Sequence, residues 1–276
     1  MASLAEHLTR RRTGVVLSSA FFGFYAHAGF MSALFKAGVK PNGIGGSSAG
    51  ALVGAFSAAG YLDQFIPVLN TLRRKDFWDP GLPGGRPWGL LKGRRFSQLL
   101  ETNLPVQRFE DCHTPLLTVS TNLETGRRHV DTTGALAPAV AASCALPFMF
   151  RAVVRDGDRH IDGGVIDKAP IEAMVNAFDL DAIVVHFIPS KTVGTPAPKG
   201  PRKFLDWALD ISRDVSWQTQ AALAEALGIE VYVVTSPYGG IGPFSMKRGA
   251  QVINTTQENV SAVLATPQET TRFAPI

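Results

Sequence analysis

The stretch that decides the fold reads GIGGSSAG at residues 43–50, followed by a run of small residues that ends at Gly60. A short apolar step leads into a glycine-rich turn, and the turn leads into a small-residue helix. This order matches G-x-S-x-G, the sharp turn that lifts a serine Oγ above the end of a sheet. Side chains at Gly46 or Gly50 would collide with the neighbouring strand or helix. The alternative is an ordinary glycine-rich turn in which Ser48 caps the helix.

Apolar runs of the kind found in buried strands recur on both sides of this turn. They lie at 15–17, 116–120, 182–188 and 230–235, with shorter strand patterns at 128–131, 151–155 and 160–162. Helical patterns lie between or after them, at 24–36, 51–59, 136–143, 170–178, 203–227 and 247–264. The Asp156-Gly157 pair is a hairpin signal. This alternation predicts an α/β fold with a mostly parallel sheet and helices on both faces.

The composition of the 276 residues fits one globular domain. Within it we expect a motif-bearing part (13–188), a Pro-rich loop (189–201) and a C-terminal helix–strand–helix part (202–276). Hydrophobic residues make up 45%, which excludes a disordered chain. Two cysteines without C-x-x-C or paired-histidine spacing predict no metal and no cofactor. A net charge of +4 alone falls short of a nucleic-acid signature, so we expect no nucleic-acid partner, and the oligomeric state stays open.

The N-terminal segment resembles a signal peptide, with basic residues at 10–12, an apolar run at 15–25 and Ala26-His27-Ala28 as a cleavage site. Cleavage there would remove the best candidate for the first strand. We therefore expect a cytoplasmic protein with peripheral membrane contact, with secretion as the alternative. The uncharged stretches 13–35 and 41–62 are long enough to span a membrane, but their Gly and Ser content favours core elements.

A serine nucleophile needs a base, commonly a histidine held by a carboxylate. No histidine follows His186, which itself lies within a predicted strand. Asp162 offers another base, because it lies between a strand end and Gly163-Gly164, and strand ends in open α/β sheets converge on the ligand crevice. The other interpretation of Asp162 is a turn aspartate that caps the following helix.

Three segments together resemble the patatin-like phospholipase family in order and spacing: the elbow at 46–50, SCALP at 143–147 and the Asp162-Gly163-Gly164 triplet. Agreement runs from about 14 to 172 and includes TNLETG at 121–126. The resemblance implies a three-layer α/β/α sandwich. It also implies a lipid acyl hydrolase with Ser48 as nucleophile, Asp162 as base and an acyl-serine intermediate. The implied partners are a lipid or phospholipid ester and, transiently, a membrane surface.

The resemblance further implies that the loop after the first strand supplies the oxyanion hole, here through the N–H groups of Ser19, Ala20 and Phe21. Relatives usually carry Gly-Gly-Gly-x-Arg/Lys-Gly in this loop, whereas this chain has SSAFFG at 18–23, so Phe22 replaces the basic residue. Ser and Ala can present their N–H groups at negative φ, while positive φ would cost about a kcal/mol. A weakly active or inactive lipid-binding relative and an acyltransferase therefore stay open as alternatives.

The segment 73–95 interleaves basic residues with Phe77, Trp78 and Trp88. This mixture is suited to an anionic lipid interface, and the alternative is a solvated loop whose aromatic side chains pack into the body. The pattern predicts an irregular surface excursion. Farther along, the helix from Lys203 carries an apolar stripe at helical spacing, which predicts core packing rather than a membrane face. The stripe consists of Phe204, Trp207, Ile211 and Val215.

Two further patterns carry less weight. Gly43-Ile44-Gly45 with Ser48 and Asp63 faintly resembles a dinucleotide fingerprint, but the third glycine is absent. Cys144 lies close to the predicted site in the sequence, and we expect a buried small hydrophobic residue there rather than a second nucleophile.

Overall fold

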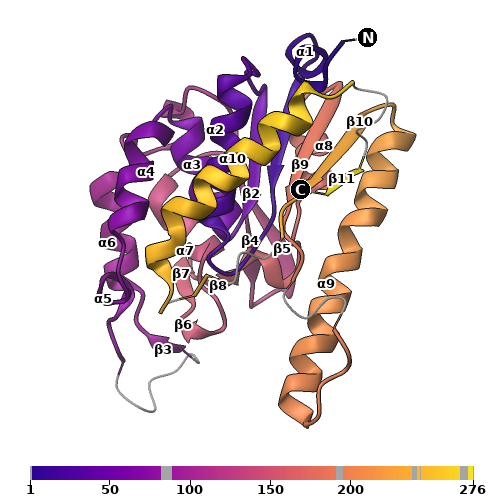
Figure 1. Cartoon of the computed structure of the whole chain (residues 1–276). Helices are drawn as coiled ribbons and strands as arrows, with labels where there is room; N and C mark the ends of the chain where they lie inside the picture. Colours follow the sequence, from indigo (N-terminus) through magenta and orange to yellow (C-terminus); the bar gives the residue numbers. More distant parts are fainter. Residues whose placement is uncertain are drawn as a thin grey trace.

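The structure is a computed structural model that describes residues 2–81, 89–190, 195–237, 241–242, 244–267 and 273–275. Within these residues, nine strands form the central sheet (Figure 1), in the order β11-β10-β9-β1-β2-β4-β8-β7, with β5 paired to β4. The parallel strands are β1 (Thr13–Leu17), β2 (Gly43–Ser47), β4 (Leu116–Asn122), β9 (Ala182–Phe187), β10 (Glu230–Thr235) and β11 (Phe273–Pro275). Antiparallel strands extend one edge: β5 (Arg127–Asp131), β7 (Val153–Arg155) and β8 (Asp158–Asp162). The predicted mostly parallel α/β fold is confirmed.

Helices cover both faces of this sheet, because successive strand residues point to opposite sides. Val15 and Leu17 join one apolar cluster, whereas Val16 joins the other. The first cluster is covered by α1 (Leu4–Thr9), α2 (Phe24–Lys36), α3 (Ala49–Ala58), α4 (Leu62–Thr71), α6 (Arg94–Asn103), α7 (Leu136–Ser143) and α10 (Gly249–Ala265). The second is covered by α8 (Ile171–Ala177) and α9 (Pro201–Ala226). The result is the three-layer sandwich.

Short elements gather where β2 and β8 end, at the bottom of Figure 1. They are α5 (Arg74–Phe77), the parallel pair β3 (Gly89–Leu91) and β6 (Phe148–Phe150), and the 3₁₀ turns η2 (Gly163–Val165) and η3 (Met246–Arg248). The 3₁₀ turn η1 (Phe109–Asp111) precedes β4 at the opposite end of the sheet, where β2 and β4 begin. The segment 73–95 was predicted to be irregular, and this is wrong in part, since it contains α5 and β3 and the start of α6. Trp88 lies outside the described residues.

Helix α9 differs from the sequence prediction in the face that it buries. Trp217 and Ala221 pack against the sheet. Phe204 and Val215 are each 51% exposed, Ile211 is exposed, and Trp207 is half-buried. At 100° per residue, the exposed apolar stripe lies opposite the buried one. The prediction that Phe204, Ile211 and Val215 form core is therefore wrong: helical spacing shows that a stripe exists, but not which side the sheet covers.

No helix in the described part of the chain combines the length and the apolar character needed to cross a bilayer. The two uncharged stretches instead form β1 with α2 and β2 with α3. Strand β1, from the segment that resembles a signal peptide, lies between β2 and β9 in the sheet.

Candidate active site

Ser48 lies on the turn between β2 and α3, with a backbone φ of 54°. A non-glycine residue at positive φ stores roughly 1–3 kcal/mol of strain and signals a functional constraint. The two flanking glycines are needed for space. A Cβ on Gly46 would lie 2.4 Å from the carbonyl carbon of Gly50, and a Cβ on Gly50 would lie 2.0 Å from the Leu17 oxygen. The turn therefore has the geometry of a nucleophile elbow.

The Ser48 hydroxyl does not cap α3 but donates a hydrogen bond to Asp162 Oδ2 at 2.6 Å. Asp162 ends β8 and is 1% exposed, and its Oδ1 accepts the Gly164 N–H at 2.7 Å. Asp162 thus caps the η2 turn and also holds Ser48. Burial raises the pKa of Asp162 to about 6, although the hydrogen bonds from Ser48 and Gly164 act to lower it. Such a carboxylate is ionised at neutral pH and basic enough to take a proton.

The two glycines after Asp162 allow close approach between segments. A Cβ on Gly163 would lie 2.1 Å from the Val119 oxygen of β4. A Cβ on Gly164 would lie 2.0 Å from Ser19 Oγ, in the loop that follows β1. The triplet therefore brings the carboxylate, β4 and the 18–23 loop together.

The 18–23 loop corrects one predicted oxyanion donor. The Ser19 N–H already donates to the Lys168 carbonyl at 2.7 Å, so it has a backbone acceptor. Among the hydrogen bonds of the described residues, none is donated by the N–H of Ala20 or Phe21. Positive φ occurs at Phe22 (56°), at the place of the family's basic residue, and not at any of the three predicted donors. Ala20 and Phe21 thus retain backbone donors for a ligand.

The SCALP segment was singled out in the sequence, but its contacts with the elbow were not predicted, and Ala49 was not singled out. Ser143 Oγ accepts the Ser48 N–H at 2.9 Å and donates to the Val119 oxygen at 2.6 Å. The Cys144 thiol donates to the Ser48 carbonyl at 3.2 Å, and burial raises the pKa of Cys144 well above its ordinary value. This thiol stays protonated and is a poor nucleophile. Ala49, the first residue of α3, has an N–H without an intrahelical acceptor; the general elbow pattern places an oxyanion donor there.

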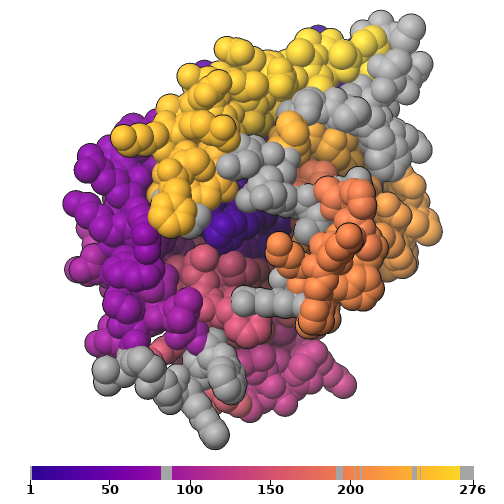
Figure 2. Space-filling model, turned by 60° about the horizontal axis from the view of Figure 1, so that its bottom comes forward, coloured from indigo at the N-terminus to yellow at the C-terminus, as the bar shows by residue number. Residues whose placement is uncertain are grey.

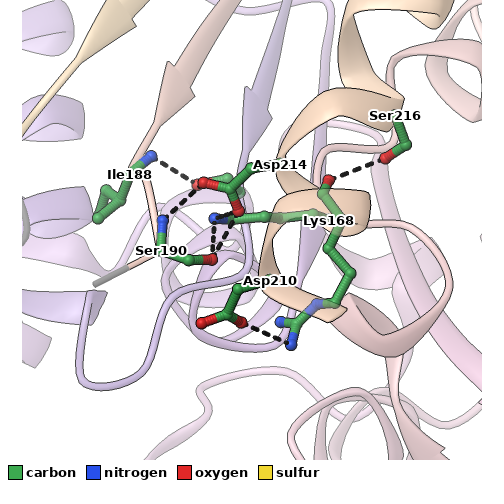
Figure 3. Close-up of polar contacts among 8 residues, drawn as sticks. Lys168, Ile188, Ser190, Asp210, Asp214 and Ser216 are labelled. Carbon is green, nitrogen blue, oxygen red and sulfur yellow. Dashed lines mark hydrogen bonds and ion pairs between the residues drawn. The ribbon is translucent and has the colours of Figure 1, made fainter. Parts of the chain in front are cut away.

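A buried cluster around Lys168 and Asp214 (Figure 3) is linked to the 18–23 loop through the backbone of Lys168. Lys168, whose carbonyl accepts the Ser19 N–H, has a side chain that is 1% exposed. Its Nζ pairs with Asp214 of α9 and donates to Ser190 Oγ at 2.8 Å. The Ser190 N–H donates to the same carboxylate at 2.7 Å. Burial lowers the pKa of Lys168 to about 8, while Asp214 acts in the opposite direction. Helix α9 and the loop are thus joined through one ion pair.

Two buried histidines lie next to this loop, and neither bonds to Ser48. His27 Nε2 donates to the Ser18 carbonyl at 2.7 Å, and the two Nδ1 atoms of His27 and His186 are 2.8 Å apart. His186 Nε2 lies 2.6 Å from Ser236 Oγ. Burial lowers the pKa of His27 to about 4 and that of His186 well below its ordinary value. Both rings are therefore neutral supports at neutral pH.

Two other kinds of site were considered in the sequence, a metal site and a dinucleotide site. Across the part of the chain that the structure describes, no three His, Cys, Asp or Glu side chains gather in a way that could hold a metal ion. Gly43 and Gly45 lie within β2 rather than in the turn after it, and Asp63 is exposed on α4. The dinucleotide interpretation is therefore wrong.

A serine held by a buried aspartate, on an elbow at the edge of a mostly parallel α/β sheet, defines the class of site. The chain belongs to the patatin-like phospholipase family, whose sequence model matches residues 15–175, more than half of the chain. An uncharacterised NTE family protein of Mycobacterium tuberculosis is 27% identical over 219 residues, which are 78% of this chain and 60% of that protein. This chain thus spans less than two thirds of that relative.

Two further similarities point to the same family and fold. The lysophospholipase NTE1 of Cryptococcus neoformans is 27% identical over 216 residues, which are 74% of this chain and 12% of that protein. The crystal structure of VipD from Legionella pneumophila superposes with a TM-score of 0.60 at 13% identity, covering 92% of this chain and 66% of VipD. The VipD comparison shows the shared fold.

Proposed function

We propose that this protein hydrolyses carboxylic esters of lipids through an acyl-serine intermediate, with Ser48 as nucleophile and Asp162 as base. The observation that carries the proposal is the 2.6 Å hydrogen bond from Ser48 Oγ to a buried carboxylate. Membership of a family whose members are typically lipid acyl hydrolases supports it. The substrate class is a lipid or phospholipid ester, met at a membrane surface.

In the first half-reaction, Ser48 Oγ bonds to the ester carbonyl carbon while its proton passes to Asp162. The N–H groups of Ala20, Phe21 and Ala49 stabilise the oxyanion. The carbon–alkoxy bond then breaks, and the leaving alcohol takes the proton from Asp162. In the second half-reaction, water gives a proton to Asp162 and attacks the acyl-serine. The carbon–Oγ bond breaks, the fatty acid leaves, and Ser48 regains its proton. An alcohol in place of water would make the reaction an acyl transfer.

A lipid-binding relative without useful turnover is the second candidate, and one observation favours it. The loop that would stabilise the oxyanion has its Ser19 N–H engaged by Lys168 and a strained Phe22 at φ 56°. Turnover separates the two candidates directly.

The test is hydrolysis of a soluble short-chain p-nitrophenyl ester and of a phosphatidylcholine. Ser48→Ala is expected to lose at least roughly a thousandfold in kcat, because the nucleophile is gone. Asp162→Asn is expected to lose roughly 10²–10⁴-fold, because the base is gone. Ser47→Ala is the matched control. Ser47 precedes the nucleophile, and its Oγ is buried and has no hydrogen-bond partner among the described residues. No turnover by the folded unaltered protein, or equal turnover by Ser48→Ala, would overturn the proposal.

A further inference from the structure

The excess positive charge of the chain is concentrated in one segment at the active-site end. Residues 73–95 hold seven Lys or Arg and two Asp, a net charge of +5, whereas the whole chain nets +4. The described part of this segment forms, with β6, a surface that we call the basic rim: 73–81, 89–95, 148–151 and Phe244. The rim elements α5, β3 and β6 lie at the bottom of Figure 1. Figure 2 shows a hollow on this face, bordered by the purple part of the chain that includes α5 and by orange α9.

Most basic side chains of the rim point to solvent without carboxylate partners. Of the seven described ones, Arg151 is half-buried and the other six are exposed, and none forms an ion pair within the described residues; the exposed six are Arg73, Arg74, Lys75, Lys92, Arg94 and Arg95. The two nearby carboxylates bond backbone instead: Asp76 accepts the Arg73 N–H at 2.7 Å and Asp79 accepts the Gly93 N–H at 3.1 Å. The rim therefore presents uncompensated cations.

Large apolar side chains stand among these cations. Phe244 is 85% exposed, Leu90 74% and Phe148 70%. The Arg74 guanidinium lies 4.3 Å from the Trp78 ring centroid and 5.0 Å from that of Phe244. Exposed aromatic rings beside Lys and Arg are typical of surfaces that meet the headgroup region of a bilayer. Within the segment 73–95, the exposed Trp78 and Leu90 fit the lipid interface, whereas Phe77 packs into the body as the alternative interpretation holds.

The rim is continuous with the candidate active site. Phe77 of α5 packs against Phe22 of the 18–23 loop, with ring centroids 6.3 Å apart. On the other side, β6 follows directly on the SCALP segment, whose Cys144 bonds to the Ser48 carbonyl. A lipid held at the rim is therefore adjacent to the elbow.

The rim also contains a cavity of about 390 Å³ between α6 and β6. Lys92, Arg94 and Arg151 line it together with one carboxylate, Glu101, and it reaches Cys144. Arg151 Nε is buried and has no hydrogen-bond partner among the described residues. A buried donor without an acceptor costs folding free energy, so its persistence next to a cationic cavity points to an anionic ligand.

We propose that the basic rim docks on the surface of a bilayer that contains anionic phospholipids, with the phosphate of one headgroup in the cavity beside Arg151. This rests on the proposed function, because it names where the lipid ester is met. Charge complementarity selects the anionic surface. The exposed rings and Leu90 select a bilayer over a soluble anion, which has no apolar phase to receive them.

The test uses Ser48→Ala protein, so that no lipid is consumed, and measures co-sedimentation with vesicles. We expect binding to phosphatidylcholine vesicles with about 30% phosphatidylglycerol to be at least about tenfold tighter than to pure phosphatidylcholine, and to weaken with added salt. Adding Lys75→Glu and Arg94→Glu is expected to weaken binding at least about tenfold. The matched control adds Lys36→Glu and Lys40→Glu, the same charge change on exposed residues outside the rim, and should bind within about twofold of the parent.

A separate variant tests whether the cavity beside Arg151 holds a headgroup phosphate. Arg151→Gln in the same background is expected to bind the anionic vesicles at least about threefold more weakly, with a melting temperature that does not fall, because an unsatisfied buried donor has been removed. Unchanged vesicle binding by Arg151→Gln would overturn the headgroup assignment. Full release of the parent by inorganic phosphate, at an ionic strength matched with chloride, would assign the cavity to a free anion instead.

The outcomes separate this proposal from the proposed function. Equal binding to neutral and anionic vesicles, or equal losses in the rim and control variants, would overturn the docking surface. Hydrolysis of the soluble ester by a protein that does not bind vesicles would also overturn the docking surface, but it would support the proposed esterase activity. Vesicle binding by a protein that hydrolyses no ester would keep the docking surface and overturn the enzyme.

Discussion

The pKa of the Asp162 carboxylate affects both the proposed catalysis and the free energy of unfolding. Burial raises that pKa from 3.8 to about 6. A raised carboxylate pKa means that the folded protein binds a proton more tightly than the unfolded chain does. The favourable contribution is complete below the unfolded pKa and is lost as the pH rises through the folded one. At neutral pH the ionised Asp162 carboxylate therefore lowers the free energy of unfolding by roughly 3 kcal/mol at most, relative to its protonated form.

Asp162→Asn should consequently stabilise the fold at about pH 8 by roughly 1–3 kcal/mol, because the amide can still accept the Gly164 N–H and contact Ser48 without a buried charge. Urea unfolding at about pH 8 and about pH 4 measures this, and the gain should vanish at the lower pH, where Asp162 is itself neutral. Ser47→Ala serves as the control, with no pH-dependent difference expected. A variant less stable than the unaltered protein at the higher pH contradicts this account.

At the scale of elements, α9 is fixed to the core by the ion pair between Asp214 and Lys168, both buried. Lys168→Met should lower the free energy of unfolding by about 3–5 kcal/mol, because it leaves the Asp214 carboxylate buried without its cation. Adding Asp214→Asn should recover most of the loss, since the amide still accepts the Ser190 N–H. A double-mutant cycle by urea unfolding measures the coupling. Simple additivity of the two single losses would refute the coupling.

The elements that were predicted correctly from the sequence are those set by local patterns of residues. The turn after β2 was predictable because its glycines are required by close backbone contacts, either within a few residues of the turn or with β1. The Lys168–Asp214–Ser190 cluster was not, because 46 residues separate its charged partners and no motif joins them. The outward apolar stripe of α9 was misassigned for the same reason: its burial depends on the sheet and not on the helix.

At the scale of the whole molecule, the fold extends over more of the chain than the part that matches the family model. The family model ends at residue 175, yet β9 and β10 continue the same parallel sheet beyond β1, and α9 covers their face. The VipD fold likewise covers 92% of the chain. The C-terminal part was predictable as helix and strand but not as the completion of this sheet, because strand pairing is set by tertiary contacts.

Whether Ser48 is a nucleophile activated by Asp162 can be measured most directly by intact-mass analysis after exposure to a fluorophosphonate. We expect one covalent adduct that is absent in Ser48→Ala and retained in Ser47→Ala. Its rate of formation should fall about tenfold per pH unit below about 6, as Asp162 becomes protonated. A folded protein that never labels, or an adduct that survives Ser48→Ala, would show that Ser48 is not the nucleophile. A labelling rate that stays flat down to about pH 4 would show that Asp162 does not activate it.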